Sequence, residues 1–418
     1  MKFLKLIMVI FFTSLCLNIV PFLLEWHLNI GFDNKSTSLN MKTGIMRILQ
    51  EKNLFTIFDK FISILNLLKM KLLIYKNEKN LIKNYKSISK LIRRNVKLLP
   101  VYEKENVTRI LLFAYFRSGS TFLGDTLQRS RRTFYHFEPL HLISFNSRID
   151  RNQTSDAFRL LSHLFRCNFN LTKRYNRWAS LRKNRFLFKR NRFLWSTCRK
   201  YSRSCFNSRY LHNICIRSPV QIMKVLRLQL KDVLIFLQGN RDLNIKLIYL
   251  SRDPRAIMSS RKELHWCQRD KCNNPVVLCE EMKNDVEELR VANISYLWIR
   301  YEDLSLNTVN VSRNLLKRLS LPFSRLLESY LLSHVRSKLI DEKNPYSTRR
   351  NSSTVPYKWL KSLTFPEINN IQTKCFEAMN IFGYVIINKS AYFDYKKQNV
   401  QLKKKLLYPS IEGLPFRS

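Results

Sequence analysis

Glycine and acidic residues are the residue types that this chain has little of. Only seven Gly occur in 418 residues, so an ordinary surface turn is a poor explanation where two of them, Gly119 and Gly124, fall together. Asp and Glu number 30 against 74 Lys and Arg, a formal net charge of +44, while 45% hydrophobic residues are typical of a globular chain. The charge indicates a polyanionic partner, but it does not choose among nucleic acid, an anionic membrane, a nucleotide and an acidic glycan.

Both glycines lie in the segment ILLFAYFRSGSTFLGDTL, residues 110–127. The apolar run over 110–116 predicts a buried strand, and helical spacing resumes over 122–127. Between them, Gly119 permits a tight curl, and the amides that follow open a helix N-terminus, which can hold phosphate. The side chains that add hydrogen-bond donors to this loop are Arg117, Ser118, Ser120 and Thr121.

The loop lacks the Gly-Lys-Ser/Thr ending with which P-loop kinases and GTPases position Mg²⁺, so those classes are excluded. A second apolar run, Ile245–Leu250, also ends in a cationic turn. Arg252 follows this run, and Ser260 lies two turns into the helix that Pro254 begins, so both residues can face one anion if the chain folds back there. Two anion sites at the ends of buried strands are what a bis-phosphorylated nucleotide requires.

The segment Thr133–Ile143, TFYHFEPLHLI, carries the candidates for a general base. Glu138, His136 and His141 stand in or after a short apolar run, where a carboxylate or an imidazole can accept a hydroxyl proton. Each of them is also compatible with a plain surface position.

Four further elements are predicted from the chain's periodicity. Apolar spacing predicts a helix over Gln221–Leu237, with Lys224 near its start. SYLWIRYEDL, residues 295–304, predicts a strand that ends in an ion pair that orders the following loop. A helix is predicted over Pro366–Phe382 and a last strand over Tyr384–Ile387.

The N-terminus predicts a membrane anchor. Residues 1–5 form a short cytosolic tail, and the apolar run over 6–24 has about the length that a bilayer requires, although a cleaved signal peptide is the alternative. Residues 25–105 are predicted to form a Lys-rich helical stem and a homodimer contact; the alternative is an amphipathic helix on the domain or on lipid headgroups. The catalytic domain is predicted over 106–395 and a basic tail over 396–418.

Eight cysteines lie outside the apolar N-terminal run, an even number that suits disulfides in an oxidising lumen, although the sequence does not select their pairing. A zinc site at His265, Cys267, Cys272 and Cys279 is the alternative, but its spacings match no standard zinc finger. Glycosylation signals of the form Asn-Xaa-Ser/Thr agree with a lumenal domain. They occur at Asn34, Asn106, Asn152, Asn170, Asn293, Asn310, Asn351 and Asn388.

The stretch Asp150–Pro219 is basic and aromatic, with repeated steps such as Arg185-Phe186 and Arg192-Phe193. Interleaved cations and rings suit single-stranded nucleic acid. They equally suit a groove for an anionic sugar chain, or a solvated cover of the domain. A lumenal topology disfavours nucleic acid.

Together these segments resemble the Golgi carbohydrate sulfotransferases, most closely the branch that sulfates the 6-hydroxyl of galactose, N-acetylglucosamine or N-acetylgalactosamine. FRSGSTFL resembles that family's 5′-phosphosulfate loop, LSRDPRAIMSSR resembles its 3′-phosphate motif, and FYHFEPLH is similar to the segment between them. RYEDL, LFRCNF and LCEEM also stand in the family's order. The resemblance covers residues 107–387.

The resemblance implies a P-loop-like three-layer α/β fold with a central parallel sheet. It also implies 3′-phosphoadenosine-5′-phosphosulfate (PAPS) as the donor, with no metal, because cationic side chains take the role of Mg²⁺. Arg252 and Ser260 would contact the 3′-phosphate. The residues that would contact the 5′-phosphosulfate are Arg117, Ser118, Gly119, Ser120, Thr121 and Phe122.

The implied reaction passes a sulfuryl group in line to a sugar hydroxyl, so the site must position two reactants, neutralise the departing phosphate and remove a proton. Arg117 is predicted to neutralise charge, because its guanidinium fork can contact phosphate and bridging oxygens together. Glu138 is predicted as the base on the pattern of related sulfotransferases, with His141 as the alternative.

The acceptor sugar is left open, because residues 150–219 resemble no single member of the family closely enough. We expect the positive charge to attract a glycosaminoglycan-like or already sulfated chain to a type II protein of the Golgi membrane. The alternatives are tyrosylprotein sulfation with the same donor, an inactive lumenal glycan-binding protein, and a nucleic-acid-binding protein.

Overall fold

A computed structural model of the chain describes Val96 and residues 99–198, 204–268, 270–335, 351–397 and 407–409. The predicted anchor and nearly all of the predicted stem, with its homodimer contact, lie outside these residues. Within the described residues, no helix has both the length and the apolar character that crossing a bilayer requires.

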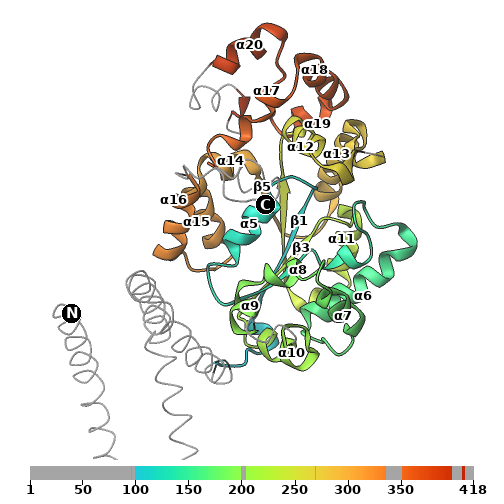
Figure 1. The fold of residues 1–418 in the computed structure, drawn as a ribbon, viewed down its shortest axis with the longest axis vertical. Helices are drawn as coiled ribbons and strands as arrows, with labels where there is room; N and C mark the ends of the chain where they lie inside the picture. Colours follow the sequence, from blue (N-terminus) through green and yellow to red (C-terminus); the bar gives the residue numbers. More distant parts are fainter. Residues whose placement is uncertain are drawn as a thin grey trace, which may run out of the picture. The chain divides into compact units, whose positions relative to one another are not determined.

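Five parallel strands form one sheet in the domain (Figure 1). Their order across the sheet is β2-β3-β1-β4-β5, which makes β1 the middle strand. Each neighbouring pair is parallel, so the predicted central parallel sheet is confirmed. The strands are β1 (Thr108–Ala114), β2 (Thr133–Phe137), β3 (Val220–Val225), β4 (Ile245–Ser251) and β5 (Tyr296–Arg300).

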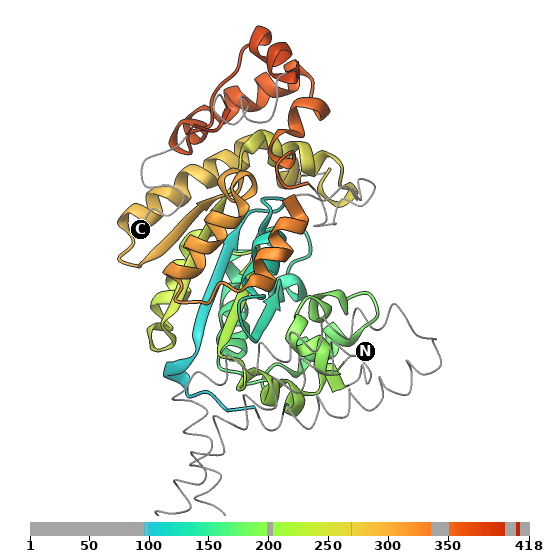
Figure 2. The same ribbon diagram turned by 90° about the vertical axis from the view of Figure 1, so that its left-hand side faces the viewer.

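Helices cover both faces of this sheet (Figures 1 and 2). The chain runs from β1 to β2 in one direction across the sheet and from β3 to β4 in the other. Because crossovers between parallel strands are right-handed, the helices α5 (Ser120–Leu127) and α11 (Leu230–Gln238) lie on opposite faces. This change of direction opens a crevice at the carboxyl end of β1, where α/β proteins bind ligands.

Further helices complete the two outer layers and the C-terminal part of the domain. They are α6 (Thr154–Phe165), α7 (Lys173–Ser180), α8 (Phe186–Lys189), α9 (Arg192–Cys198), α10 (Ser208–Cys215), α12 (Pro254–Lys262), α13 (Pro275–Val291), α14 (Tyr301–Leu306), α15 (Thr308–Arg318), α16 (Arg325–Val335), α17 (Trp359–Ser362), α18 (Phe365–Lys374), α19 (Phe376–Ile381) and α20 (Lys389–Lys397).

The single helix predicted over Gln221–Leu237 is wrong. Residues 220–225 are strand β3, and helix α11 begins only at Leu230. β3 is buried along its whole length, so its apolar residues follow one another without the alternation that marks a half-buried strand. Lys224 therefore stands at the carboxyl end of a central strand, directly beside β1.

The helix predicted over Pro366–Phe382 is interrupted, and the strand predicted over Tyr384–Ile387 is wrong. α18 ends before Cys375, whose disulfide partner is Cys279, and α19 follows it. Residues 384–387 are irregular, because side chains bind their backbone groups. The side-chain oxygen of Gln372 accepts from Ile387 N at 3.0 Å, and Arg255 Nη1 donates to the Val385 carbonyl at 2.8 Å.

The eight cysteines of the domain form four disulfides, Cys167–Cys215, Cys198–Cys205, Cys267–Cys272 and Cys279–Cys375. Every cysteine of the zinc alternative is thus oxidised, and that alternative is wrong. In the part of the chain that the structure describes, no cluster of three or more His, Cys, Asp or Glu side chains is arranged to hold a metal ion.

The ion pair predicted after the last strand is confirmed. Arg300 is buried, and its Nε and Nη2 each donate to Asp303 at 2.9 Å. The strand itself ends at Arg300, and residues 301–306 continue as helix α14. Tyr301 thereby faces the loop after β1.

Part of the predicted basic tail packs inside the domain. Leu407 and Tyr408 are buried. The Tyr408 hydroxyl donates to the Pro356 carbonyl at 2.8 Å and accepts from Trp359 Nε1 at 2.9 Å.

Candidate functional site

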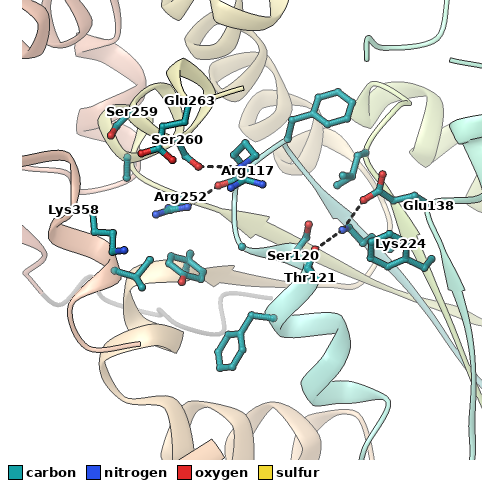
Figure 3. Close-up of a pocket in the computed structure, with 18 of the residues that line it drawn as sticks. Arg117, Ser120, Thr121, Glu138, Lys224, Arg252, Ser259, Ser260, Glu263 and Lys358 are labelled. Atoms are coloured by element: carbon teal, nitrogen blue, oxygen red, sulfur yellow. Dashed lines mark hydrogen bonds and ion pairs between the residues drawn. The ribbon is translucent and has the colours of Figure 1, made fainter. Parts of the chain in front are cut away.

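Residues 117–122, called here the β1 loop, follow the middle strand and include the first residues of helix α5 (Figure 3). Gly119 has a φ of 91°, and a Cβ at this position would lie 2.2 Å from the Tyr301 ring, so only glycine fits. Arg117 also has a positive φ, 71°, which costs a non-glycine residue about 1–3 kcal/mol. The surrounding contacts therefore hold the loop in a strained shape, with helix amides at its end that suit an anion.

Arg252 and Ser260, the predicted second anion site, lie against this loop. Arg252 Nη1 donates to the carbonyl of Arg117 at 2.7 Å, and Arg117 Nε donates to Ser260 Oγ at 2.9 Å (Figure 3). Asp253 caps α12 by accepting from Arg255 N at 2.8 Å, so this helix begins at Pro254 as predicted. The two predicted anion sites are thus contiguous and share Arg117.

A central cavity of about 600 Å³ opens at the carboxyl ends of the strands and brings nearly all of the predicted site residues together. Its volume suits a nucleotide-sized ligand. Predicted residues that line it are Arg117, Gly119, Ser120, Thr121, Phe122, Glu138, His141, Arg252 and Ser260.

Two candidates point away from this cavity. Ser118 is fully buried and its hydroxyl donates to the Tyr115 carbonyl at 2.8 Å, so its side chain braces the β1 loop. His136 is buried between Phe134 and Phe169, with ring centroids 4.8 and 6.3 Å away. Burial lowers the pKa of His136 to about 3, which leaves it a neutral core residue.

Glu138 follows β2 with a φ of 47°, and its carboxylate faces the cavity (Figure 3). Lys224 Nζ and Arg227 Nη1 each lie 2.8 Å from one of its oxygens. Burial raises the pKa of the Glu138 carboxyl. The charges of Lys224 and then Arg227 lower this pKa by more than burial raises it, and the net result is a pKa of about 2. Glu138 is therefore ionised at neutral pH and able to accept a proton, although it is a weak base.

Lys224 and Arg227 also line the cavity, and neither was predicted as a site residue from the sequence. Lys224 is 2% exposed, and besides Glu138 it donates to Thr121 Oγ1 at 2.9 Å, so it joins the β1 loop to the candidate base. Parallel pairing sets Phe137 opposite Lys224, which brings Glu138 to the lysine. A lysine inside a continuous apolar run was the available signal, since a buried ammonium requires a partner.

His141 lies in the short helix η2 (Pro139–Leu142) at the aromatic side of the cavity. Its ring is 4.9 Å from Phe145, 5.7 Å from Trp178 and 5.9 Å from Phe186, measured between centroids. Burial, followed by the charge of Arg227, lowers the pKa of the imidazole, which favours its neutral form. The geometry allows His141 to contact a second substrate beside Glu138.

The cavity is strongly cationic. Glu138 and Glu263 are its lining carboxylates, and at the second anion site Ser259 Oγ lies 2.7 Å from Ser362 Oγ. This excess of cations favours a ligand with several anionic groups. Each attraction between a cation and an anionic group is stronger in the low-dielectric cavity than in water. The lining cations are Arg117, Arg190, Lys224, Arg227, Arg252 and Lys358.

Comparison with known proteins gives one consistent group of relatives. No family model matches the chain. Carbohydrate sulfotransferase 3 of Rattus norvegicus is 24% identical over 329 residues, which cover 68% of this chain and 69% of that protein. Carbohydrate sulfotransferase 1 of Mus musculus is 27% identical over 337 residues, which cover 69% of this chain and 82% of that protein.

Solved structures with some similarity are also sulfotransferases. The sulfotransferase domain from the Synechococcus PCC 7002 olefin synthase is 20% identical, with 69% of this chain and 98% of that chain covered and a TM-score of 0.40. Mouse sulfotransferase SULT7A1 complexed with PAP is 13% identical, with 72% and 90% covered and a TM-score of 0.32. Both scores are too low to establish a shared fold.

Proposed function

We propose that this chain, like its curated relatives, is a carbohydrate sulfotransferase that moves a sulfuryl group from PAPS to a sugar hydroxyl. The observation that carries the proposal is the shared position of Arg117 between the two anion sites. PAPS has anionic groups at both its 5′ and its 3′ end. Two linked anion sites, on a loop without the Gly-Lys-Ser/Thr ending, suit PAPS better than they suit a nucleoside triphosphate.

In the donor site, the β1 loop would hold the 5′-phosphosulfate. Its amides from Gly119 onward and the Arg117 side chain supply hydrogen-bond donors. Ser118 holds the loop in shape through its hydrogen bond to the Tyr115 carbonyl. Arg252 and Ser260 would hold the 3′-phosphate, which distinguishes PAPS from ATP. Lys358 and Ser259 line the same end of the cavity.

Transfer breaks the bond between sulfur and the donor's phosphate oxygen and forms a bond from sulfur to the acceptor oxygen. The electron pair of the broken bond stays on the phosphate, where Arg117 and Lys224 stabilise the added charge. The hydroxyl proton passes to Glu138. A carboxylate with a pKa of about 2 suffices if the proton leaves late, after the acceptor oxygen has become acidic through its new bond to sulfur.

The acceptor we propose is the 6-hydroxyl of galactose, N-acetylglucosamine or N-acetylgalactosamine in a glycan or glycosaminoglycan. The aromatic side of the cavity, formed around His141 by Phe145 and Phe186, supports a sugar because ring faces stack on the apolar face of a pyranose. Tyrosylprotein sulfation and inactive glycan binding are the competing functions.

We further propose that the protein is a type II glycoprotein of the Golgi membrane, anchored through residues 6–24. Four disulfides support an oxidising compartment. Of the glycosylation signals in the described residues, Asn351 is half-buried. The exposed ones are Asn106, Asn152, Asn170, Asn293, Asn310 and Asn388. Removal of N-glycans by an endoglycosidase, read as a gel shift, tests this topology.

The deciding experiment incubates purified full-length protein with ³⁵S-labelled PAPS and separate glycan and tyrosine-peptide acceptors. We expect label in the glycans, with Arg117→Ala abolishing transfer. Arg241→Ala, at an exposed position just before β4 and outside the cavity lining, should leave transfer intact. Label in the peptides would favour tyrosylprotein sulfation. Absence of label in every acceptor would reject the proposed reaction.

A further inference from the structure

A second hollow, of about 380 Å³, lies on the surface beside the central cavity. It is formed by Arg174, Arg177 and Trp178 of helix α7 and by Leu181, which follows that helix. Both arginines are exposed, Trp178 is half-buried, and Leu181 is 50% exposed. The hollow thus has an apolar floor and a cationic rim.

The cationic rim is not neutralised by its own segment. No Asp or Glu occurs between Asp156 and Asp232, whereas nineteen Lys or Arg do. Other arginines of this segment reach carboxylates elsewhere, as Arg166 does with Asp242 at 2.8 Å. Within the described residues, neither Arg174 nor Arg177 forms an ion pair, so both guanidinium groups are available to an external anion.

Trp178 gives the hollow a second property that a plain solvated face lacks. Its ring is held in place by Tyr175 at 6.2 Å and by His141 at 5.7 Å, both between centroids. An indole fixed in this way offers a flat surface to the apolar face of a sugar, while the adjacent guanidinium groups bind a carboxylate or a sulfate ester.

The hollow adjoins the central cavity across the contact between Trp178 and His141. His141, which packs on Trp178, lines the central cavity together with Phe186 of α8, whose ring centroid lies 5.9 Å from that of His141. A sugar chain with one unit beside Glu138 could therefore extend past His141 onto Trp178. Because the two hollows are neighbours, we expect them to bind one oligosaccharide rather than two separate small anions.

We propose that Arg174, Arg177, Trp178 and Leu181 form an accessory acceptor subsite for a carboxylated or sulfated sugar unit of the chain being modified. The proposal rests on the proposed function. It identifies the acceptor as a polyanionic glycan and locates the residues that recognise its charge, which lie apart from the reacting centre.

The first test measures binding without catalysis. Purified full-length protein is titrated with a size-defined sulfated glycosaminoglycan oligosaccharide, with no donor present, at low and high salt. We expect Arg174→Ala/Arg177→Ala to raise the Kd about fivefold to tenfold and to reduce its salt dependence, because each exposed ionic contact contributes a factor of a few. The control Arg241→Ala/Arg290→Ala removes the same charge from two other exposed arginines and should leave the Kd within about twofold of the original.

The second test compares acceptors. The ratio of kcat/KM for the sulfated oligosaccharide to that for a neutral oligosaccharide of equal length should fall in Arg174→Ala/Arg177→Ala and stay constant in the control. If circular dichroism shows that this variant is misfolded, Arg174→Gln/Arg177→Gln replaces it and keeps the side-chain length.

An unchanged Kd in the folded variant, or an equal loss in the control, overturns the subsite. Failure of the unaltered protein to bind the oligosaccharide also overturns it. Absence of sulfuryl transfer to every acceptor, with the binding difference intact, would instead reject the proposed reaction and leave an anionic glycan site.

Discussion

The guanidinium of Arg252 donates a 2.7 Å hydrogen bond to the carbonyl oxygen of Arg117, which joins the turn after β4 to the loop after β1. Arg117 in turn donates from Nε to Ser260 Oγ at 2.9 Å. Both the backbone and the side chain of Arg117 are therefore held by residues proposed to bind the 3′-phosphate. A ligand bound there would contact the same two residues that position the arginine proposed to stabilise the transferring group.

Replacement of Arg252 should distinguish the binding of the donor's 3′-phosphate from the binding of its 5′ end. We expect Arg252→Ala to weaken binding of adenosine 3′,5′-bisphosphate roughly 10- to 160-fold, since a hydrogen bond to a charged group contributes about 1.5–3 kcal/mol. The fold-increase in Kd for adenosine 5′-phosphate should be at least ten times smaller, because this nucleotide has no 3′-phosphate and loses only the hydrogen bond by which Arg252 holds the Arg117 carbonyl. Calorimetric titration measures both, with Arg241→Ala as the control. Equal losses for the two nucleotides would show that Arg252 acts on the loop alone.

Glu138→Gln tests the candidate base. We expect kcat to fall about 10²- to 10⁴-fold, the usual contribution of a positioned base, while the Kd for adenosine 3′,5′-bisphosphate changes little. Because the pKa of Glu138 is about 2, the unaltered enzyme should show no loss of kcat from this group between pH 5 and pH 8. Glu263→Gln, a second carboxylate of the cavity, is the matched comparison. Full turnover in the Glu138 variant would leave His141 as the base.

Lys224→Met tests the bridge between Thr121 and Glu138. The substitution removes one of the two cations that offset the burial of Glu138, so the pKa of the carboxyl should rise. We therefore expect a lower kcat and a new acid limb in the pH–rate profile, at a pH below which Glu138 becomes protonated. Lys231→Met, at an exposed position of α11, should retain the flat profile. A flat profile in the Lys224 variant would show that Arg227 alone sets this pKa.

The β1 loop could be predicted from sequence because its signals are local. An apolar strand, a loop with one of seven glycines, and a helix start follow one another within residues 110–127. The structure adds that Tyr301, nearly two hundred positions later in the chain, fills the space over Gly119. This contact depends on strand order and has no local signal.

Lys224 was missed for a physical reason. β3 is buried on both faces, so it lacks the alternation that distinguishes a strand from a helix, and the lysine in it was assigned to the wrong element. Its contact with Glu138 follows from the register of β2 on β3. Ser118 looks like a ligand contact in the sequence, but its hydroxyl donates to the carbonyl of Tyr115, three residues earlier, and so points into the protein.

Glu302, in the segment RYED, connects the turn after β4 to the C-terminal part of the domain. Its Oε1 accepts from Asp253 N at 3.1 Å, and its Oε2 accepts from the Tyr384 hydroxyl at 3.1 Å. Burial first, and then the charge of Asp253, raise the pKa of Glu302 to about 7. The folded state thus favours the protonated carboxyl, whereas the unfolded state ionises near pH 4.5.

This difference predicts a pH-dependent stability. Protonated Glu302 adds to the free energy of unfolding. This addition is fully present below about pH 4.5 and is lost as pH rises through about 7, because the unfolded chain releases the proton at a lower pH than the folded chain does. Glu302→Gln stays neutral, so its Tm should fall less than that of the unaltered protein between pH 5 and pH 8. Scanning calorimetry in low-salt buffers measures both, with Glu287→Gln on an exposed face of α13 as the control. Parallel Tm curves for the unaltered protein and Glu302→Gln would mean that Glu302 is already ionised in the fold, with Arg252 and Arg300 as its counter-charges.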